Sequence, residues 1–311
     1  MHNKDILVTC IIPTYNREKL VVNAINSVIN QSFEYWELII IDDLSTDNTW
    51  EIINNYAKKD KRILCLKNSE KGANNARNLG IKMARGKYIA FLDDDDISLP
   101  HRFECQYKVM HNSGARFIVS WYEIRDRLSG KLIRIDKKAH KSSEVGFPSR
   151  WMIEKSLLDE VGGFNPKMKA MQEIELSFRL AQKYVFAHHL EVVAIIYNTP
   201  DSTSSSSKAI IGKLQLIDEV GYIMQPVELA YWNLIIALDY YKKGNMEKAK
   251  KYFQDASNLR ANKIISIAYY YFMLVHPNRF ALLRKINRLI IIMCTQKFTF
   301  SLIKHPIVSC K

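Results

Sequence analysis

Short apolar runs alternate with segments of helical periodicity over roughly the first ninety residues. An apolar run of a few residues predicts a buried strand, whereas apolar residues that recur every three to four positions predict an amphipathic helix. We expect strands at 6–12, 36–41, 63–66 and 87–92, and helices at 20–31, 48–56 and 74–84. Strands that alternate with helices indicate a mostly parallel α/β sheet with right-handed crossovers.

The pattern changes in the second third of the chain. We predict antiparallel strands at 116–122 and 131–135, helices at 151–160 and 172–183, and a strand at 192–197. A polar, Ser-rich stretch then precedes a pattern that is helical to the end of the chain. The sequence therefore predicts an α/β domain over residues 1–207 and a C-terminal all-α extension over residues 208–311.

The C-terminal extension contains two kinds of helical segment. Residues 231–241 and 246–259 resemble one tetratricopeptide hairpin, although one unit cannot form a stacked array. The apolar segments 264–275 and 286–293 are too short to span a bilayer. These two segments either lie in a membrane interface or pack on the main domain.

Positive charge is concentrated in this extension. The chain carries a net charge of +13, and from Lys242 to Lys311 there are fourteen Lys and Arg residues against two acids. Such a patch suggests a polyanionic neighbour. Aromatic residues 269–271 are not interleaved with the basic ones, so we expect peripheral contact with an anionic membrane and no nucleic-acid partner.

Three features of the sequence indicate the cellular compartment of the protein. We expect no secretory leader, because residues 1–5 lead directly into a strand-like run, and no run reaches the roughly 18 uninterrupted apolar residues of a membrane span. The five cysteines are scattered and form no CxxC pair, which is typical of reduced thiols. We expect a cytoplasmic protein that can lie peripherally on the inner face of the cell membrane.

Four consecutive carboxylates, at residues 93–96, follow the strand at 87–92. Ionised carboxylates cannot be buried unpaired, so this cluster is either a solvated turn or neutralised by a cation. The carboxyl ends of parallel strands are where ligands bind, and loops 13–16 and 42–43 should open on the same edge. Oxygen ligands there suit Mg²⁺ or Mn²⁺ held together with a substrate phosphate.

Several of these segments, in this order, resemble a family 2 glycosyltransferase of GT-A fold. The resemblance covers about residues 5–205 and excludes the helical extension. It rests on Ile-Ile-Pro-Thr-Tyr-Asn-Arg at 11–17, Gln-Ser-Phe at 31–33, the run at 37–47 ending Asp-Asp-Leu-Ser-Thr-Asp, Ala-Arg-Asn-Leu-Gly at 76–80, the strand and acids at 86–96, Gly-Gly-Phe at 162–164 and Gln-Glu-Ile-Glu-Leu at 172–176.

The resemblance implies that a sugar is transferred, with inversion, from a nucleotide-diphosphate donor, with a UDP-sugar as the first choice. By similarity, the nucleotide base lies against Pro13, Tyr15 and Asp43, and Arg77 lies near the donor. The acidic run corresponds to the DxD motif, which binds the donor ribose and a divalent metal, Mn²⁺ or Mg²⁺. Its register stays open between Asp93 with Asp95 and Asp94 with Asp95. We assign Asp93 and Asp94 to the donor and Asp95 and Asp93 to the metal.

The acceptor hydroxyl needs a general base, and Glu173 is the candidate. It occupies the position where the family more often has Asp. Glu175 is the nearby competitor, and the alternative for Glu173 is a helix-start acid favoured by the dipole.

Other residues are less informative. Trp151 either lines an acceptor pocket or packs in the core. We expect His188 and His189 to form a solvated corner, and His101 has no ligand partner nearby in the sequence.

The leading functional hypothesis is a metal-dependent inverting glycosyltransferase acting on a glycan or lipid-linked acceptor in bacterial surface polysaccharide synthesis. The alternative is a catalytically degenerate GT-A scaffold that acts through its helical extension.

Overall fold

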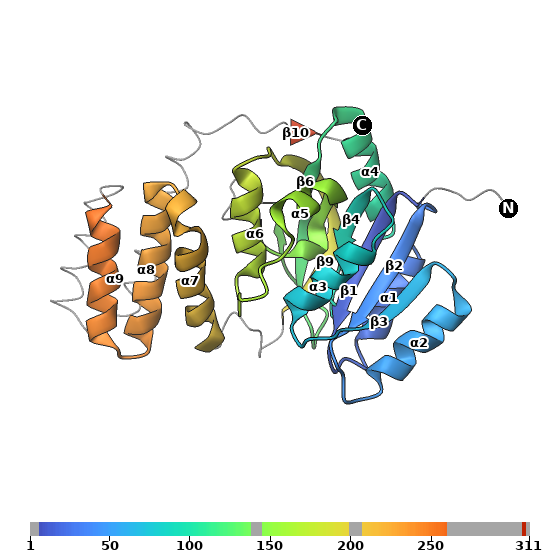
Figure 1. The fold of residues 1–311 in the computed structure, drawn as a ribbon, viewed down its shortest axis with the longest axis horizontal. Coiled ribbons are helices and arrows are strands. Elements are labelled where there is room, and N and C mark those ends of the chain that lie inside the picture. Colours follow the sequence, from blue (N-terminus) through green and yellow to red (C-terminus); the bar gives the residue numbers. More distant parts are fainter. Residues whose placement is uncertain (1–5, 138–144, 199–206, 260–306, 309–311) are drawn as a thin grey trace. The chain divides into compact units, whose positions relative to one another are not determined.

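The structure, a computed structural model, describes residues 6–137, 145–198, 207–259 and 307–308 (Figure 1). The chain divides into two compact units. One comprises residues 1–206 together with 305–311, and the other comprises residues 207–304.

The first unit is built on a ten-stranded mixed sheet in which β4, β1, β2 and β3 are parallel neighbours in that order. The order is β10-β9-β6-β8-β4-β1-β2-β3, with β5 paired to β9 and β7 to β6. The strands are β1 (Val8–Thr14), β2 (Trp36–Asp42), β3 (Ile63–Lys67), β4 (Tyr88–Phe91), β5 (Ile97–Ser98), β6 (Phe117–Asp126), β7 (Leu132–Asp136), β8 (Trp151–Glu154), β9 (Ala187–Asn198) and β10 (Ile307–Val308). The predicted parallel order of the first half and the antiparallel pair β6–β7 are confirmed.

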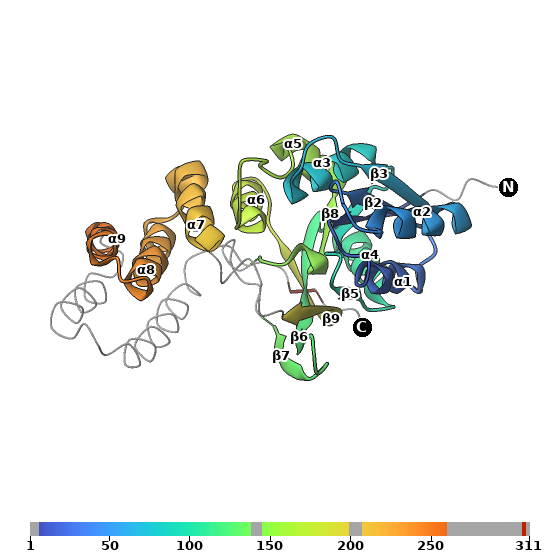
Figure 2. The same ribbon diagram turned by 90° about the horizontal axis from the view of Figure 1, so that it is seen from below.

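Helices cover both faces of this sheet (Figure 2). Helices α1 (Val21–Ile29), α2 (Thr49–Lys59) and α4 (Arg102–Ser113) contribute to one apolar core, and α3 (Ala73–Met83), α5 (Lys155–Val161) and α6 (Gln172–Ala181) contribute to the other. Strand β1 supplies both cores because successive side chains alternate between faces: Cys10 and Ile12 lie in the first, and Ile11 in the second. This layering is the expected mixed α/β architecture of the GT-A fold.

The predicted helix at 151–160 is wrong in its first half. Trp151–Glu154 forms β8, which pairs antiparallel with both β4 and β6, and α5 begins only at Lys155. The free edges of two neighbouring strands override the local helical pattern. Trp151 is fully buried and its ring packs edge-on to Phe117, which supports the core interpretation over the acceptor-pocket one.

The expectation of a solvated corner at His188 and His189 is also wrong. Strand β9 begins at Ala187, five residues earlier than predicted, and both histidines are buried within it. They are paired in parallel register with β6 on one side and with Ile307 and Val308 of β10 on the other. The helical expectation for the end of the chain therefore fails at these two β-branched residues, which suit a strand.

The second unit contains the predicted helical hairpin. Its helices are α7 (Ser207–Val220), α8 (Pro226–Lys242) and α9 (Met246–Asn258), with a short 3₁₀ helix at Gly221–Ile223. The side chain of Asn245 caps α9 by accepting from the Lys248 amide, and Phe253 lies in the apolar seam between α8 and α9. The apolar segments 264–275 and 286–293 lie outside the described residues. None of the helices that could be examined combines the length and hydropathy of a bilayer-spanning segment.

Candidate active site

Three parallel strands bring their polar ends to one edge of the sheet. Thr14 at the end of β1 is in register with Asp42 at the end of β2, and the Asp43 amide donates to the Thr14 carbonyl oxygen over 2.8 Å. The loop after β4 joins them, since the Tyr15 amide donates to Oδ2 of Asp94 over 3.4 Å. The loops at 13–16, 42–43 and 93–96 therefore open together, as expected.

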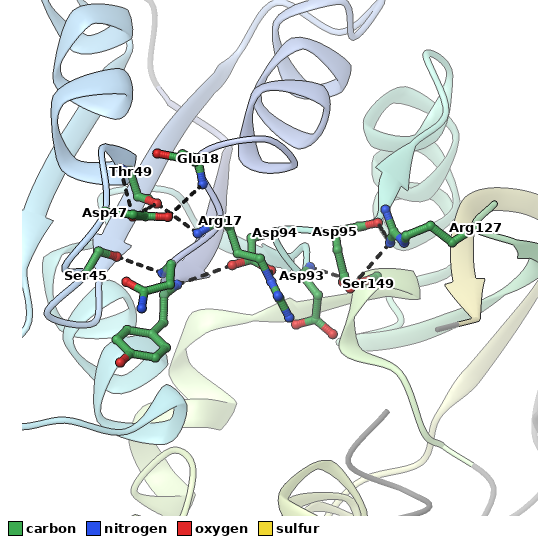
Figure 3. Close-up of polar contacts among 12 residues, drawn as sticks. Arg17, Glu18, Ser45, Asp47, Thr49, Asp93, Asp94, Asp95, Arg127 and Ser149 are labelled. Atoms are coloured by element: carbon green, nitrogen blue, oxygen red, sulfur yellow. Dashed lines mark hydrogen bonds and ion pairs between the residues drawn. The ribbon is translucent and has the colours of Figure 1, made fainter. Parts of the chain in front are cut away.

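The first three acidic residues each face an arginine from a different part of the chain. Figure 3 shows their side chains diverging from one turn, with Asp94 directed toward Arg17 and Asp95 toward Arg127. The nearest N–O distances are 2.7 Å for Arg77–Asp93, 3.5 Å for Arg17–Asp94 and 3.4 Å for Arg127–Asp95. Pairing of this kind is what allows carboxylates to persist at a partly buried edge.

The fourth acidic residue, Asp96, has a different environment. It is buried, and its Oδ2 accepts from the Ser149 hydroxyl over 2.6 Å while its Oδ1 accepts from the Tyr197 amide over 3.3 Å. The same Ser149 oxygen accepts from the Asp93 amide over 3.1 Å (Figure 3). Asp96 therefore anchors the acidic turn to the strands behind it, which removes it from the candidates for ligand contact.

Burial and mutual repulsion raise the pKa values of three carboxyl groups in the acidic turn. Burial raises the pKa of Asp94 to about 6, and burial followed by the charges of Asp93 and Asp95 raises the pKa of Asp96. Burial, followed by the charge of Asp93, also raises the pKa of Asp95. The side chains of Asp93 and Asp95 are 31% and 23% exposed, so carboxylate oxygens remain accessible. One or two such oxygens are the usual protein contribution to a Mg²⁺ or Mn²⁺ site completed by phosphates, so this donor set fits a divalent cation.

Asp43 organises the neighbouring loop. Its Oδ1 accepts from Nδ2 of Asn68 over 2.7 Å and from the Gly72 amide over 2.8 Å. Gly72 has a φ of 145°, a conformation that glycine adopts readily and other residues rarely do. The preceding residue, Lys71, places Nζ 3.8 Å from the centroid of the Tyr15 ring. Asp43 and Tyr15 thus contact neighbouring residues of one loop, Asp43 through Gly72 and Tyr15 through Lys71, next to the ends of β1 and β2.

Helix α3 joins this edge to the second half of the domain. The Asn78 side chain accepts from the Phe164 amide over 2.8 Å and donates to the Phe164 carbonyl oxygen over 2.7 Å. Gly163 sits directly beside it, and a Cβ there would lie 2.5 Å from Oδ1 of Asn78. The Gly-Gly-Phe segment is therefore required for close approach between α3 and the loop that precedes α6.

Arg77, one residue before Asn78, is buried beside this loop. One of its Nη groups donates to Asp93, and its guanidinium carbon lies 5.4 Å from the centroid of the Phe164 ring. Its Nε and its other Nη group have no hydrogen-bond partner. Buried donors without partners are rare in native proteins, so these two groups are available to a ligand.

The structure separates the two candidate bases on α6. Both oxygens of Glu175 accept from Arg179, at 2.6 and 2.7 Å, and Arg179 also donates to the carbonyl oxygens of Val161 and Gly163. Glu173 is instead close enough to the acidic turn for its titration to be affected by it. Burial raises the pKa of Glu173, which the charge of Arg77 lowers and that of Asp93 raises. Glu175 is thus committed to structure, whereas the charges of Arg77 and Asp93 act on Glu173.

Sequence reasoning identified most of these residues but missed Arg127 and Ser149 as partners. Both are distant in sequence from the acidic turn and belong to no motif, so only the tertiary pairing reveals them. Arg17 lies within the Ile-Ile-Pro-Thr-Tyr-Asn-Arg segment, but its pairing with Asp94 was likewise not predicted. Pro13, also in that segment, is buried in β1 opposite Ile41.

Comparisons with known proteins show which family this chain resembles. The sequence profile of Glycosyl transferase family 2 matches residues 9–162. An Escherichia coli enzyme, UDP-Glc:alpha-D-GlcNAc-diphosphoundecaprenol beta-1,3-glucosyltransferase WfaP, is 43% identical over 38% of this chain and 47% of its own length. An uncharacterized glycosyltransferase of Rickettsia bellii is 43% identical over 47% of this chain and 21% of its own. The chain thus matches less than half the length of these two relatives.

A third relative and two solved structures extend the match. TuaG of Bacillus subtilis, named for teichuronic acid biosynthesis, is 38% identical over 67% of this chain and 85% of its own length. S. aureus TarS shares the fold with a TM-score of 0.62 at 15% identity, over 81% of this chain and 48% of TarS. Mannosyltransferase PcManGT from Pyrobaculum calidifontis has a TM-score of 0.56 at 14% identity, over 94% and 87%. Together with the profile match, the similarity to TuaG shows that the chain belongs to glycosyl transferase family 2.

Proposed function

We propose that this protein is a metal-dependent inverting glycosyltransferase that moves a sugar from a nucleotide-diphosphate donor to a hydroxyl group of a glycan or lipid-linked acceptor. The observation that carries the proposal is the position of Glu173. Burial raises the pKa of its carboxyl group, and the charges of Arg77 and Asp93 affect it, which supports a place for Glu173 beside the acidic turn that can hold a cation. Such a transfer needs a general base for the acceptor, a cationic side chain such as Arg77 for the donor diphosphate, and a site for a divalent cation.

The donor would occupy the surface above the strand ends. The nucleotide base would lie against Pro13, Tyr15 and Asp43, with the exposed ring of Tyr15 as the stacking face opposite Lys71. Asp93 and Asp94 would contact the ribose. The two unpartnered donor groups of Arg77 suit the diphosphate, because a guanidinium fork matches phosphate oxygens.

Asp95 and Asp93 would hold the divalent cation. When bound, Mg²⁺ or Mn²⁺ neutralises charge that develops on the departing diphosphate. Arg127 orients Asp95 by contacting its side chain and donating to its carbonyl oxygen. Ser149 holds the turn from behind, so the ligand carboxylates are presented by a fixed backbone.

Glu173 would act on the acceptor. Its carboxylate oxygen accepts the proton of the attacking hydroxyl group, and its raised pKa brings it nearer to neutral pH, where a base is most effective. Attack from the side opposite the diphosphate inverts the configuration at the anomeric carbon. Glu175 cannot substitute, because its oxygens are occupied by Arg179.

The donor and acceptor classes are proposed from similar proteins. TarS has been crystallised with UDP-GlcNAc and with UDP, PcManGT with GDP-Man and Mn²⁺, and WfaP is named for a UDP-Glc donor and a diphosphoundecaprenol-linked acceptor. A UDP-sugar donor and a lipid-linked acceptor in bacterial surface polysaccharide synthesis are the combination we favour. The basic C-terminal region would then place the protein on the cytoplasmic face of the membrane, where anionic headgroups attract it.

A nucleotide-sugar panel tests the proposal. Thermal unfolding of the full chain is followed with UDP-, GDP- and dTDP-sugars, each with Mg²⁺, with Mn²⁺ or with EDTA. We expect one base to raise the Tm in a metal-dependent way, because ligands that bind only the folded state stabilise it. No response to any donor would instead favour the degenerate scaffold.

A further inference from the structure

We propose that α4 and β9 form a second metal site, separate from the acidic turn, which binds Zn²⁺ through His101, Cys105, His189 and Glu191. None of these residues belongs to the donor site described above.

The site rests first on proximity. In the parts of the chain that the structure describes, a single group of three or more metal-ligating side chains comes together, namely His101, Cys105 and Glu191. Their ligand atoms all lie within 4.8 Å of one another. His101 and Cys105 are four residues apart, at the start of α4 and in its first turns, and therefore lie on one side of the helix.

A bulge in β9 supplies the carboxylate. The pairing of β9 with β6 passes from Ser120–His189 directly to Trp121–Val192, so Leu190 and Glu191 are left out of the ladder. Bulges of this kind redirect a side chain that regular pairing would place elsewhere.

The second, independent observation is His189. Its side chain is fully buried and its Nε2 has no hydrogen-bond partner. The nearest carboxylate oxygen, Oε2 of Glu191, is 3.9 Å away, which is too far for a hydrogen bond. A buried nitrogen without a partner is costly, and a cation between it and Glu191 would satisfy both.

Both histidines have the supporting contacts that orient metal ligands. Nδ1 of His189 lies 3.1 Å from the Ser120 hydroxyl oxygen, which also accepts from the Gln106 side chain. Nε2 of His101 lies 3.0 Å from the carbonyl oxygen of Val192. If these two nitrogens carry the protons, Nε2 of His189 and Nδ1 of His101 are the bare ones. Hydrogen bonds from the second ring nitrogen are typical of histidine ligands.

The mixture of donor atoms identifies the metal. Two imidazole nitrogens, one thiolate sulfur and one carboxylate oxygen match the four-coordinate preference of Zn²⁺, whereas the acidic turn offers only oxygen and suits harder cations. A Zn²⁺ ion here would join α4 to β9. Strand β5, which lies between Asp96 and α4, already pairs with β9, so the ion would stabilise the segment that follows the acidic turn.

Cobalt substitution tests the site. The tag-free, metal-free full chain is titrated with Co²⁺ in excess Mg²⁺, and the visible bands of a thiolate-bound, four-coordinate ion are recorded. We expect one equivalent of Co²⁺ to produce these bands and Zn²⁺ to abolish them. The variants are His101→Gln, which alters an exposed side chain, and Cys105→Ser. The matched controls are Cys65→Ser, at a cysteine on β3, and Asp95→Asn, in the donor site.

The variants should separate the two metal sites. Cys105→Ser should remove the thiolate band and His101→Gln should weaken Zn²⁺ binding at least about tenfold, since even supporting residues of metal sites contribute that much. Both controls should retain the bands, and Zn²⁺ should raise the Tm of the wild type but not of Cys105→Ser. Absence of the bands in the wild type, or bands that survive in Cys105→Ser, would overturn the proposal.

Discussion

Nη2 of Arg77, on helix α3, lies 2.7 Å from Oδ1 of Asp93, on the acidic turn. This pair connects the helix that holds the Gly-Gly-Phe loop to the turn that would hold the cation. The rest of the Arg77 guanidinium has no hydrogen-bond partner although it is buried. A residue that is half satisfied by protein in this way is prepared for an anionic ligand.

Replacing Arg77 with lysine should therefore weaken donor binding while retaining the charge. A lysine ammonium can pair with Asp93 but cannot present two further donor groups in one plane. Loss of one or two charge-assisted hydrogen bonds, about 1.5–3 kcal/mol, corresponds to a roughly 10–100-fold higher Kd for the nucleotide sugar. Calorimetric titration of the donor measures this. An unchanged Kd in Arg77→Lys would exclude a direct contact between Arg77 and the donor.

Replacing Asp95 should chiefly affect turnover, whereas replacing Asp96 should chiefly affect stability. Asp95→Ala should reduce turnover by about 100-fold, if the cation supplies several kcal/mol, with little change in Tm. Asp96→Ala should instead lower the free energy of unfolding by about 1–3 kcal/mol, because the Ser149 hydroxyl and the Tyr197 amide both lose their acceptor. Urea unfolding and initial rates on the same preparations distinguish the two effects. The reverse pattern would show that Asp96 is the functional carboxylate.

The two neighbouring glycines before Phe164 provide a matched pair for stability. Gly162 and Gly163 have φ values of 78° and 69°, so alanine at either site introduces backbone strain of about 1 kcal/mol. At Gly162 the added Cβ meets nothing within 4 Å, whereas at Gly163 it lies 2.5 Å from Asn78 Oδ1. Gly163→Ala should thus be clearly less stable than Gly162→Ala in urea unfolding. Equal losses would mean that the Asn78 contact adjusts without cost.

Stability should depend on pH through Asp94. Its pKa in the folded state is about 6, above the ordinary value of 3.8, so the native state binds more protons than the unfolded state between these pH values. The contribution of Asp94 to the free energy of unfolding is therefore most favourable at low pH and is lost as the pH rises through about 6. Asp94→Asn should be more stable than the wild type by roughly 2–3 kcal/mol at pH 7, with the difference shrinking toward pH 4. A difference that does not vary with pH would contradict the shift.

The first half of the fold could be predicted because each strand is an apolar run and each connecting helix has a clear period. The edge that carries the site follows from the same pattern, since parallel strands place the ends of β1, β2 and β4 together. The resemblance to a known family added the roles proposed for Glu173 and Arg77.

The parts of the fold and the site that the sequence did not predict depend on contacts between residues that are distant in the chain. Trp151 lies in a segment of helical period, but the open edges of β4 and β6 draw it into a strand. His189 looks polar and exposed in sequence, and only the position of β9 beside β6 shows that it is buried. Arg127, in the turn after β6, and Ser149, in the 3₁₀ helix Pro148–Arg150, reach the acidic turn from segments that share no local pattern with it.

The central claim is that Glu173 is the base of a sugar transfer, and comparing Glu173→Gln with Glu175→Gln tests it most directly. Transfer from a radiolabelled nucleotide sugar to a lipid-diphosphate-linked acceptor is measured with Mn²⁺, together with donor Kd and Tm. We predict that Glu173→Gln lowers kcat by about 10²–10⁴-fold with an unchanged donor Kd and a Tm that is not lowered. Glu175→Gln should chiefly lower the Tm, because it disrupts the contact with Arg179. Full transfer activity in Glu173→Gln would contradict the account.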